Sequence, residues 1–157
     1  MKVSFIKESE QKYNLTCVRN DGTTTSADLE MRSYFKHDLM HFVVERMAHI
    51  DYGFFGKIIH GMQVEELSPK AIKVRNETMD PKEHALEMIV ASLQKTHPTD
   101  TDVDEFIVRV SEYLAQLNVT PPHYFSVGFV RSVLKEFNDL LRKWHLLRHG
   151  GILTVNF

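Results

Sequence analysis

Residues 12–25 read KYNLTCVRNDGTTT, and this stretch decides the predicted fold. From residue 13 to residue 17 apolar side chains alternate with polar ones, which is typical of a half-buried strand. Asp21 and Gly22 then supply a hairpin turn, because glycine adopts a positive φ without a steric penalty. With the β-prone residues 3–6 before it, the stretch predicts a three-stranded antiparallel meander.

The end of the chain has a similar strand pattern. Gly150 and Gly151 favour the end of a helix, and residues 152–157 read ILTVNF, with apolar residues alternating on one face. A lone strand needs a hydrogen-bonded neighbour, and the N-terminal meander is the one sheet that the sequence predicts. We therefore expect the terminal strand to join the meander.

The middle of the chain predicts helices. Asp80 as N-cap, Pro81 at the first position and Glu83 two residues later make a clear helix start. His97 and Pro98 end that helix, and residues 71–74 are assigned to irregular chain or one more strand. The predicted helices span residues 34–49, 80–94, 101–118 and 126–149.

The predicted fold class is therefore α+β, with a small antiparallel sheet packed on about four helices. The sheet consists of the N-terminal meander and the C-terminal strand. At 157 residues the chain is predicted to form one domain, residues 1–157.

Charge and cysteine content narrow the classes of function. There are 19 basic and 21 acidic residues, so the chain lacks the basic excess of a large nucleic-acid interface. Cys17 is the only cysteine, which excludes an internal disulfide and a cysteine-rich zinc site. No apolar run approaches the about 20 residues of a membrane span, and the polar N-terminus differs from a signal peptide. We expect a cytoplasmic protein that contacts neither nucleic acid nor membrane. The sequence leaves open whether it forms a homo-oligomer or binds a protein partner.

The segment from residue 37 to residue 49, HDLMHFVVERMAH, carries the clearest indication of function. Each residue of a helix is rotated by about 100° around the axis from the residue before it. The histidines and carboxylates of this segment therefore lie within an arc of about 120°. The arc contains no lysine, arginine or glutamine, whereas a plain solvent-facing stripe mixes those residues in. We call this set the polar stripe; it consists of His37, Asp38, His41, Glu45 and His49.

His37 and His41 lie one helical turn apart, so their rings can converge on one cation. Imidazole nitrogen suits a divalent transition metal, of which zinc is the first expectation and iron or nickel are others. Such a site needs a further ligand from another part of the chain. We predict His60 for this role. The other candidates are His84, Glu87, His123 and the pair His145 and His149, and of these the last pair is favoured.

Asp38 and Glu45 are predicted as a third ligand or as partners that orient the imidazoles. If the protein is an enzyme, metal-assisted hydrolysis is the expected class. The metal would then lower the pKa of a bound water, and Asp38 or Glu45 would take its proton.

The helix resembles in part the His-Glu-x-x-His helix of zinc peptidases. It departs from that pattern because Asp38 stands in place of the glutamate that acts as general base, and no further histidine motif follows.

The first sixty residues resemble an uncharacterised family of bacterial proteins of unknown function. The residues that carry the resemblance are 19–22 (RNDG), 37–45 (HDLMHFVVE), 53–56 (GFFG) and Gly61. The resemblance implies that the hairpin, the helix and the glycine turn belong to one unit, and it implies no activity.

A second interpretation of the polar stripe needs no metal. Its histidines and carboxylates also fit an internal hydrogen-bond network, because buried polar groups need such partners. The protein would then be a non-enzymatic interaction module that pairs through its hairpin or through the edge of its terminal strand.

Overall fold

The computed structural model describes residues 1–67, 79–96 and 102–157. Its sheet has four antiparallel strands in the order β3-β2-β1-β4, so the predicted union of the meander and the terminal strand is confirmed. The two ends of the chain lie side by side, and the N-terminal ammonium donates to the carbonyl oxygen of Phe157 at 3.1 Å. The strands are β1 (Lys2–Lys7), β2 (Lys12–Val18), β3 (Thr24–Glu30) and β4 (Ile152–Asn156).

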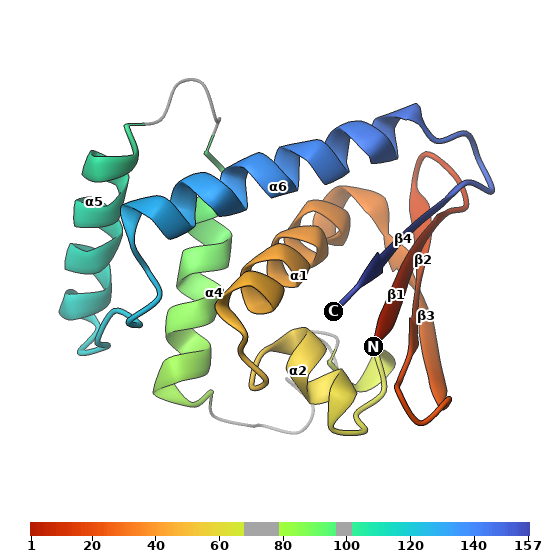
Figure 1. Cartoon of the computed structure of the whole chain (residues 1–157), viewed down its shortest axis with the longest axis horizontal. Coiled ribbons are helices and arrows are strands. Elements are labelled where there is room, and N and C mark those ends of the chain that lie inside the picture. Colours follow the sequence, from red (N-terminus) through yellow and green to blue (C-terminus); the bar gives the residue numbers. More distant parts are fainter. Residues whose placement is uncertain (68–78, 97–101) are drawn as a thin grey trace.

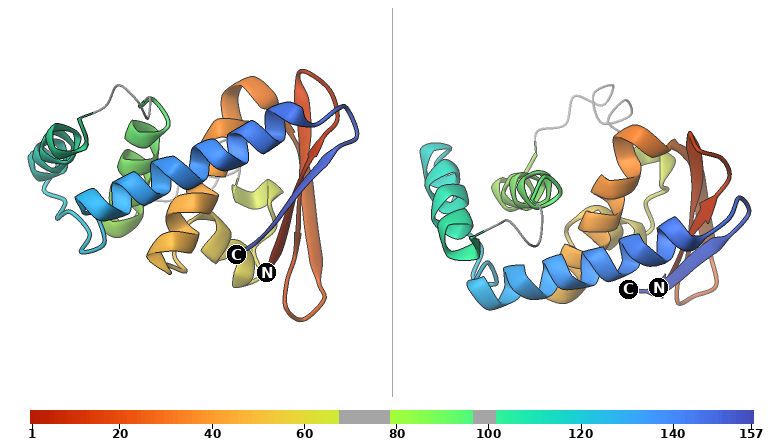
Figure 2. Two further views of the ribbon diagram at one scale, coloured as in Figure 1. Left: turned by 45° about the horizontal axis from the view of Figure 1, so that its top comes forward. Right: turned by 90° about the horizontal axis from the view of Figure 1, so that it is seen from above.

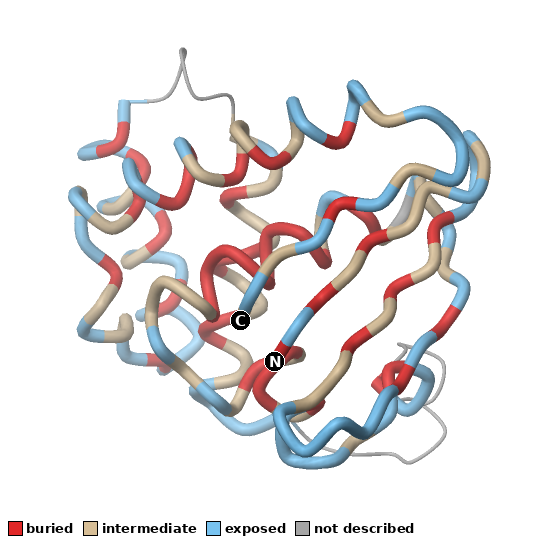
Figure 3. The backbone as a smooth tube through the Cα atoms, turned by 45° about the vertical axis from the view of Figure 1, so that its right-hand side comes forward, coloured by how far each residue is buried: buried red, intermediate tan, exposed pale blue. Residues whose placement is uncertain are grey.

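One face of this sheet forms part of the core. Buried and accessible residues alternate along the strands, as the colours of Figure 3 show. Phe5 of β1 faces Leu15 of β2 on one side and Leu153 of β4 on the other, and all three are buried. Cys17 belongs to the same face and is fully buried.

The described residues form five α-helices where about four were predicted. The additional one is α2, which begins in the glycine turn at residue 54. N-caps begin three helices, since Asp80, Asp102 and Ser126 each accept a hydrogen bond from a backbone N–H of the first turn. The helical elements are η1 (Met31–Phe35, a π-helix), α1 (Lys36–Ala48), α2 (Phe54–Ile59), η2 (Glu65–Leu67, a 3₁₀-helix), α4 (Pro81–Leu93), α5 (Val103–Gln116) and α6 (Val127–Leu146).

Two expectations concern segments outside the described residues. They are the optional strand at residues 71–74 and the helix end at residues 97–98.

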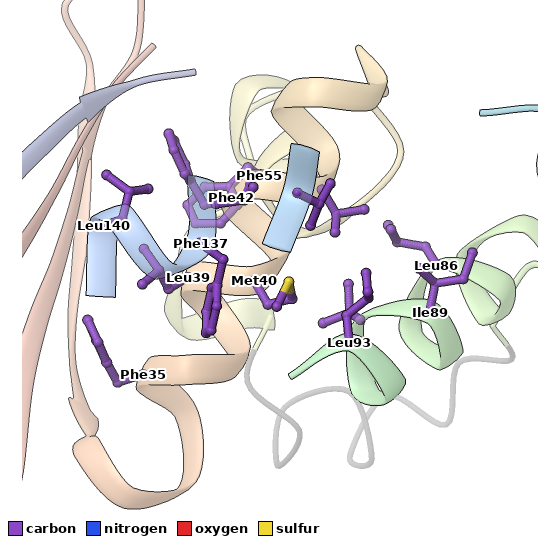
Figure 4. Close-up of a cluster of buried hydrophobic side chains, with 14 of the residues drawn as sticks. Phe35, Leu39, Met40, Phe42, Phe55, Leu86, Ile89, Leu93, Phe137 and Leu140 are labelled. Carbon is purple, nitrogen blue, oxygen red and sulfur yellow. The ribbon is translucent and has the colours of Figure 1, made fainter. Parts of the chain in front are cut away.

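Helix α1 lies at the centre of the molecule, between the sheet and α4 (Figure 1). Helix α6 crosses α1 and runs from α5 toward the sheet, which Figure 2 shows from two further sides. Side chains from α1, α4 and α6 meet in this centre, among them Met40, Leu93 and Phe137 (Figure 4). None of the helices in the described part of the chain has the length and hydropathy of a membrane span.

Candidate metal centre

The polar stripe of α1 meets a carboxylate of α4. His41 Nε2 lies 3.2 Å from Glu87 Oε1, and His37 Nε2 lies 3.5 Å from Glu87 Oε2. The two imidazole rings are 4.6 Å apart, centre to centre. One ligand atom from each of the three residues lies within 4.8 Å of the other two, so the three groups converge on one place.

The other nitrogen of each ring is held by an acceptor. His41 Nδ1 donates to Glu45 Oε1 at 3.0 Å, and His37 Nδ1 donates to the amide oxygen of Gln94 at 3.3 Å. A hydrogen-bond donor at Nδ1 carries the proton of a neutral imidazole, which leaves the lone pair at Nε2. An imidazole that is neutral in this tautomer would direct the lone pair of Nε2 toward the Glu87 carboxylate.

Acceptors that face one another at these distances need a cation between them. Without metal, a proton at Nε2 of His41 takes this place, and the imidazole then donates a hydrogen bond to Glu87. Burial alone would lower the pKa of this imidazole, but its hydrogen bonds to Glu45 and Glu87 outweigh burial and raise the pKa to about 10. Burial likewise would raise the pKa of Glu87, and the hydrogen bonds from His37 and His41 instead hold it well below its usual range.

The centre runs from the surface into the interior. The side chains of Glu87 and His37 are 36% and 29% exposed, whereas those of His41 and Glu45 are 3% and 0% exposed. A cation between the imidazoles and Glu87 would thus be reached by solvent from one side. Its inner ligand, His41, would be held in place by a buried carboxylate, an arrangement common at metal-bound histidines.

Glu45 holds the start of α2. Its carboxylate accepts from the backbone N–H groups of Phe54, Phe55 and Gly56 at 2.8, 2.9 and 3.2 Å, and from His41. Negative charge at a helix N-terminus is favourable, and the N–H groups leave this buried carboxylate well satisfied. The pairing of Glu45 with His41, expected from their spacing, is confirmed. Glu45 is a partner of a candidate ligand rather than a member of the converging group.

Asp38 contacts the sheet and is not a member of the converging group. It is buried, and its carboxylate accepts a hydrogen bond from the hydroxyl of Tyr13 in β2. Burial raises the pKa of Asp38 to about 6, against the opposing effects of Tyr13 and the two histidines. Its observed role is to tie α1 to the sheet.

The histidines predicted as further ligands lie elsewhere. His60 ends α2 on the surface, with its Nε2 at 3.4 Å from Asp51 and its side chain 62% exposed. His149 pairs with Glu10 at 2.9 Å, and His145 is exposed on α6. Among the described residues, the group that contains His37 and His41 and could hold a metal ion has Glu87 as its third member.

Glu87 was one of several candidates for the further ligand in the sequence, behind His60 and the pair His145 and His149. One local pattern does point to it: Glu87 and Gln94 are seven residues apart, so they lie on one face of α4. That face packs beside α1. Glu87 lies near Nε2 of His37, and Gln94 accepts a hydrogen bond from Nδ1 of the same ring.

Comparisons with known proteins add no relative: no protein-family model matches the chain, and neither a curated protein nor a solved structure gives a significant match. The likeness to an uncharacterised bacterial family therefore stays a prediction.

The raised pKa of His41 makes the stability of the metal-free protein depend on pH. In the unfolded chain this imidazole titrates at about 6.5, whereas the folded protein keeps its proton to about pH 10. Its contribution is complete below the unfolded value and is lost as the pH rises toward the folded value. Between about pH 7 and 8.5 we expect the free energy of unfolding to fall by up to about 1.4 kcal/mol per pH unit.

Urea unfolding in the presence of a chelator measures this slope. His41→Gln should flatten this slope. His84→Gln, which changes a half-buried histidine of α4 outside the centre, should leave the slope as in the wild type. A wild-type protein whose stability is flat over this interval would contradict a protonated His41.

Proposed function

We propose that the protein binds one divalent transition metal ion, with zinc as the first candidate, through His37, His41 and Glu87. The observation that carries the proposal is the orientation of the two imidazoles. Both have Nδ1 engaged by an oxygen acceptor and Nε2 directed at the same carboxylate. Metal-binding histidines are commonly oriented in this way.

The distances also support the proposal. Two ligands of a tetrahedral zinc, each about 2.0–2.1 Å from the metal, are about 3.4 Å apart. The two separations between Nε2 and the Glu87 oxygens, 3.2 and 3.5 Å, bracket that value. Two imidazoles and a carboxylate leave further coordination positions, which the exposed side of the centre can fill with water.

The proposal covers metal binding and does not extend to hydrolysis. A hydrolase needs a base beside the metal-bound water. Glu45 already accepts four N–H groups, and Asp38 is buried against Tyr13. Neither carboxylate is placed to take a proton from a water on the exposed side of the centre.

The test is a metal titration of protein purified without a histidine tag and stripped with a chelator. We expect about one equivalent of Zn²⁺ or Co²⁺ to bind, with a raised melting temperature. His37→Gln and Glu87→Gln should each weaken binding by more than about tenfold, since even the loss of a ligand's outer partner has an effect of that size. Both side chains are partly exposed, so these variants are expected to fold.

Two matched controls separate this site from unspecific binding. Glu83 lies one turn before Glu87 on α4, and its carboxylate pairs with Lys57. The first control, Glu83→Gln, removes this carboxylate. His60→Gln changes the histidine that the sequence favoured. Both should bind metal as the wild type does. Less than about a tenth of an equivalent bound, or equal losses in the controls, would overturn the proposal and favour a structural hydrogen-bond network.

A further inference from the structure

A second feature lies beside the start of α1, and its lining shares no residue with the metal centre. There the structure has a cavity of about 340 Å³, bounded by η1 and the first residue of α1, by the end of β1, and by the C-terminal half of α6. Its volume is at the lower end of the range of small-molecule sites, about 300–1,000 Å³.

Basic side chains dominate the polar lining of this cavity. They are Lys7, Arg32, Lys36 and His145, which come from β1, η1, α1 and α6. The chain as a whole has a net charge of −2, so overall composition does not account for this local gathering of basic groups.

Among the described lining residues, one carboxylate, that of Glu10, stands beside these basic groups. Within residues 1–67, 79–96 and 102–157, none of the four forms an ion pair. Lys7 Nζ donates to the carbonyl oxygen of Leu147 at 3.2 Å. The one acidic residue of the lining, Glu10, is engaged at the rim by His149. Like charges gathered around one cavity repel each other, and a bound anion would relieve this repulsion.

The inner wall of the cavity is apolar. Phe35 and Trp144 stack with their ring centres 4.1 Å apart, and both are almost completely buried. Met31 and Leu141 complete the apolar part of the lining. A few charged groups around an apolar wall is the usual composition of a site for a small organic ligand.

We propose that this cavity binds a small organic anion, a carboxylate or phosphate group on an apolar body of about the size of one ring. The acidic group lies among Arg32, Lys36 and His145, and the apolar body lies along Phe35 and Trp144. The site is separate from the metal centre, and its occupation does not require a bound metal.

Trp144 is the only tryptophan, so its fluorescence reports directly on the cavity. The experiment titrates the full chain with phenyl phosphate, benzoate and inorganic phosphate, with chelator present. We expect a saturable fluorescence change with phenyl phosphate or benzoate, weaker at higher salt because charge attraction is screened. Inorganic phosphate, which has no apolar body, should bind at least about tenfold more weakly.

The variant Arg32→Gln/Lys36→Gln removes two exposed charges from the rim. Hydrogen bonds to charged groups are among the stronger polar contacts, so the double variant should weaken binding at least about tenfold. Lys143→Gln, next to Trp144 but outside the lining, is the matched control and should bind as the wild type does.

Three results would overturn the proposal. One is the absence of a saturable response to all three probes. Another is equal affinity for inorganic phosphate and phenyl phosphate, which would refute the apolar part of the site. The third is an equal loss in Lys143→Gln and in the double variant, which would indicate attraction by surface charge in general.

Discussion

Glu45→Gln is expected to lower the free energy of unfolding by about 3–5 kcal/mol, the range for breaking a buried ion pair. The carboxylate is fully buried and accepts three backbone N–H groups of α2 as well as His41 Nδ1. A glutamine at this position turns an NH₂ group toward those donors, which leaves N–H groups unsatisfied in the interior. Urea unfolding at neutral pH, with and without Zn²⁺, measures the loss.

The matched control is Glu136→Gln. Glu136 pairs with Arg46 of the same helix α1 at 2.9 Å, but both side chains are about one third exposed. An ion pair of that exposure contributes about 0–1 kcal/mol, so this variant should stay within about 1 kcal/mol of the wild type. If Glu45→Gln lost as little as the control, the role of Glu45 in holding α2 would be refuted.

Gly56→Ala is expected to destabilise the fold by about 3 kcal/mol, because an added methyl group has no room. A Cβ atom at Gly56 would lie 2.1 Å from the backbone carbonyl carbon of Asp51. The obstacle is main chain, which cannot rotate away as a flexible side chain would. Thermal unfolding measures the effect, and a folded variant of unchanged melting temperature would contradict the packing described for α2.

Gly128→Ala is the control for this prediction. Gly128 lies in α6, and a Cβ atom there would meet nothing within 4 Å. Alanine in a helix is up to about 1 kcal/mol more favourable than glycine, so the control should be as stable as the wild type or more stable.

The two large effects both concern how the start of α2 is packed, against Glu45 of α1 and against the connection between the two helices. A Cβ atom at Gly53 would lie 2.3 Å from the carboxyl carbon of Glu45, so the first glycine of the GFFG stretch leaves room for that carboxylate. The second, Gly56, lets the helix pass close to the main chain of Asp51. The turn that precedes α2 thus has its glycines where two close approaches require them.

Several features of the fold followed from the sequence because they depend on neighbouring residues. Alternation in residues 13–17 predicted β2, and Asp80 and Ser126 marked helix starts through their own side chains. The one-turn spacing of His37 and His41 placed both rings on one side of α1. The pairing of Glu45 with His41 is equally local, since it joins residues four apart.

The partners of the polar stripe did not follow from it. The carboxylate that faces both imidazoles is Glu87, although His60 was the favoured ligand from outside the helix. Asp38 and Glu45, expected beside a metal-bound water, are held by Tyr13 and by the N–H groups of α2. The cationic cavity also had no counterpart in the sequence, because its charges come from β1, η1, α1 and α6.

The two groups of features differ in how far apart in the sequence their determining residues lie. Periodicity, caps and one-turn spacings are properties of a few consecutive residues, and they determined the strands, the helices and the face of α1 that carries the histidines. Which groups oppose that face depends on how α1 packs against α4, α2 and the sheet. His37 and Gln94 are 57 positions apart, and only burial of the apolar sides of both helices in one core brings them into contact.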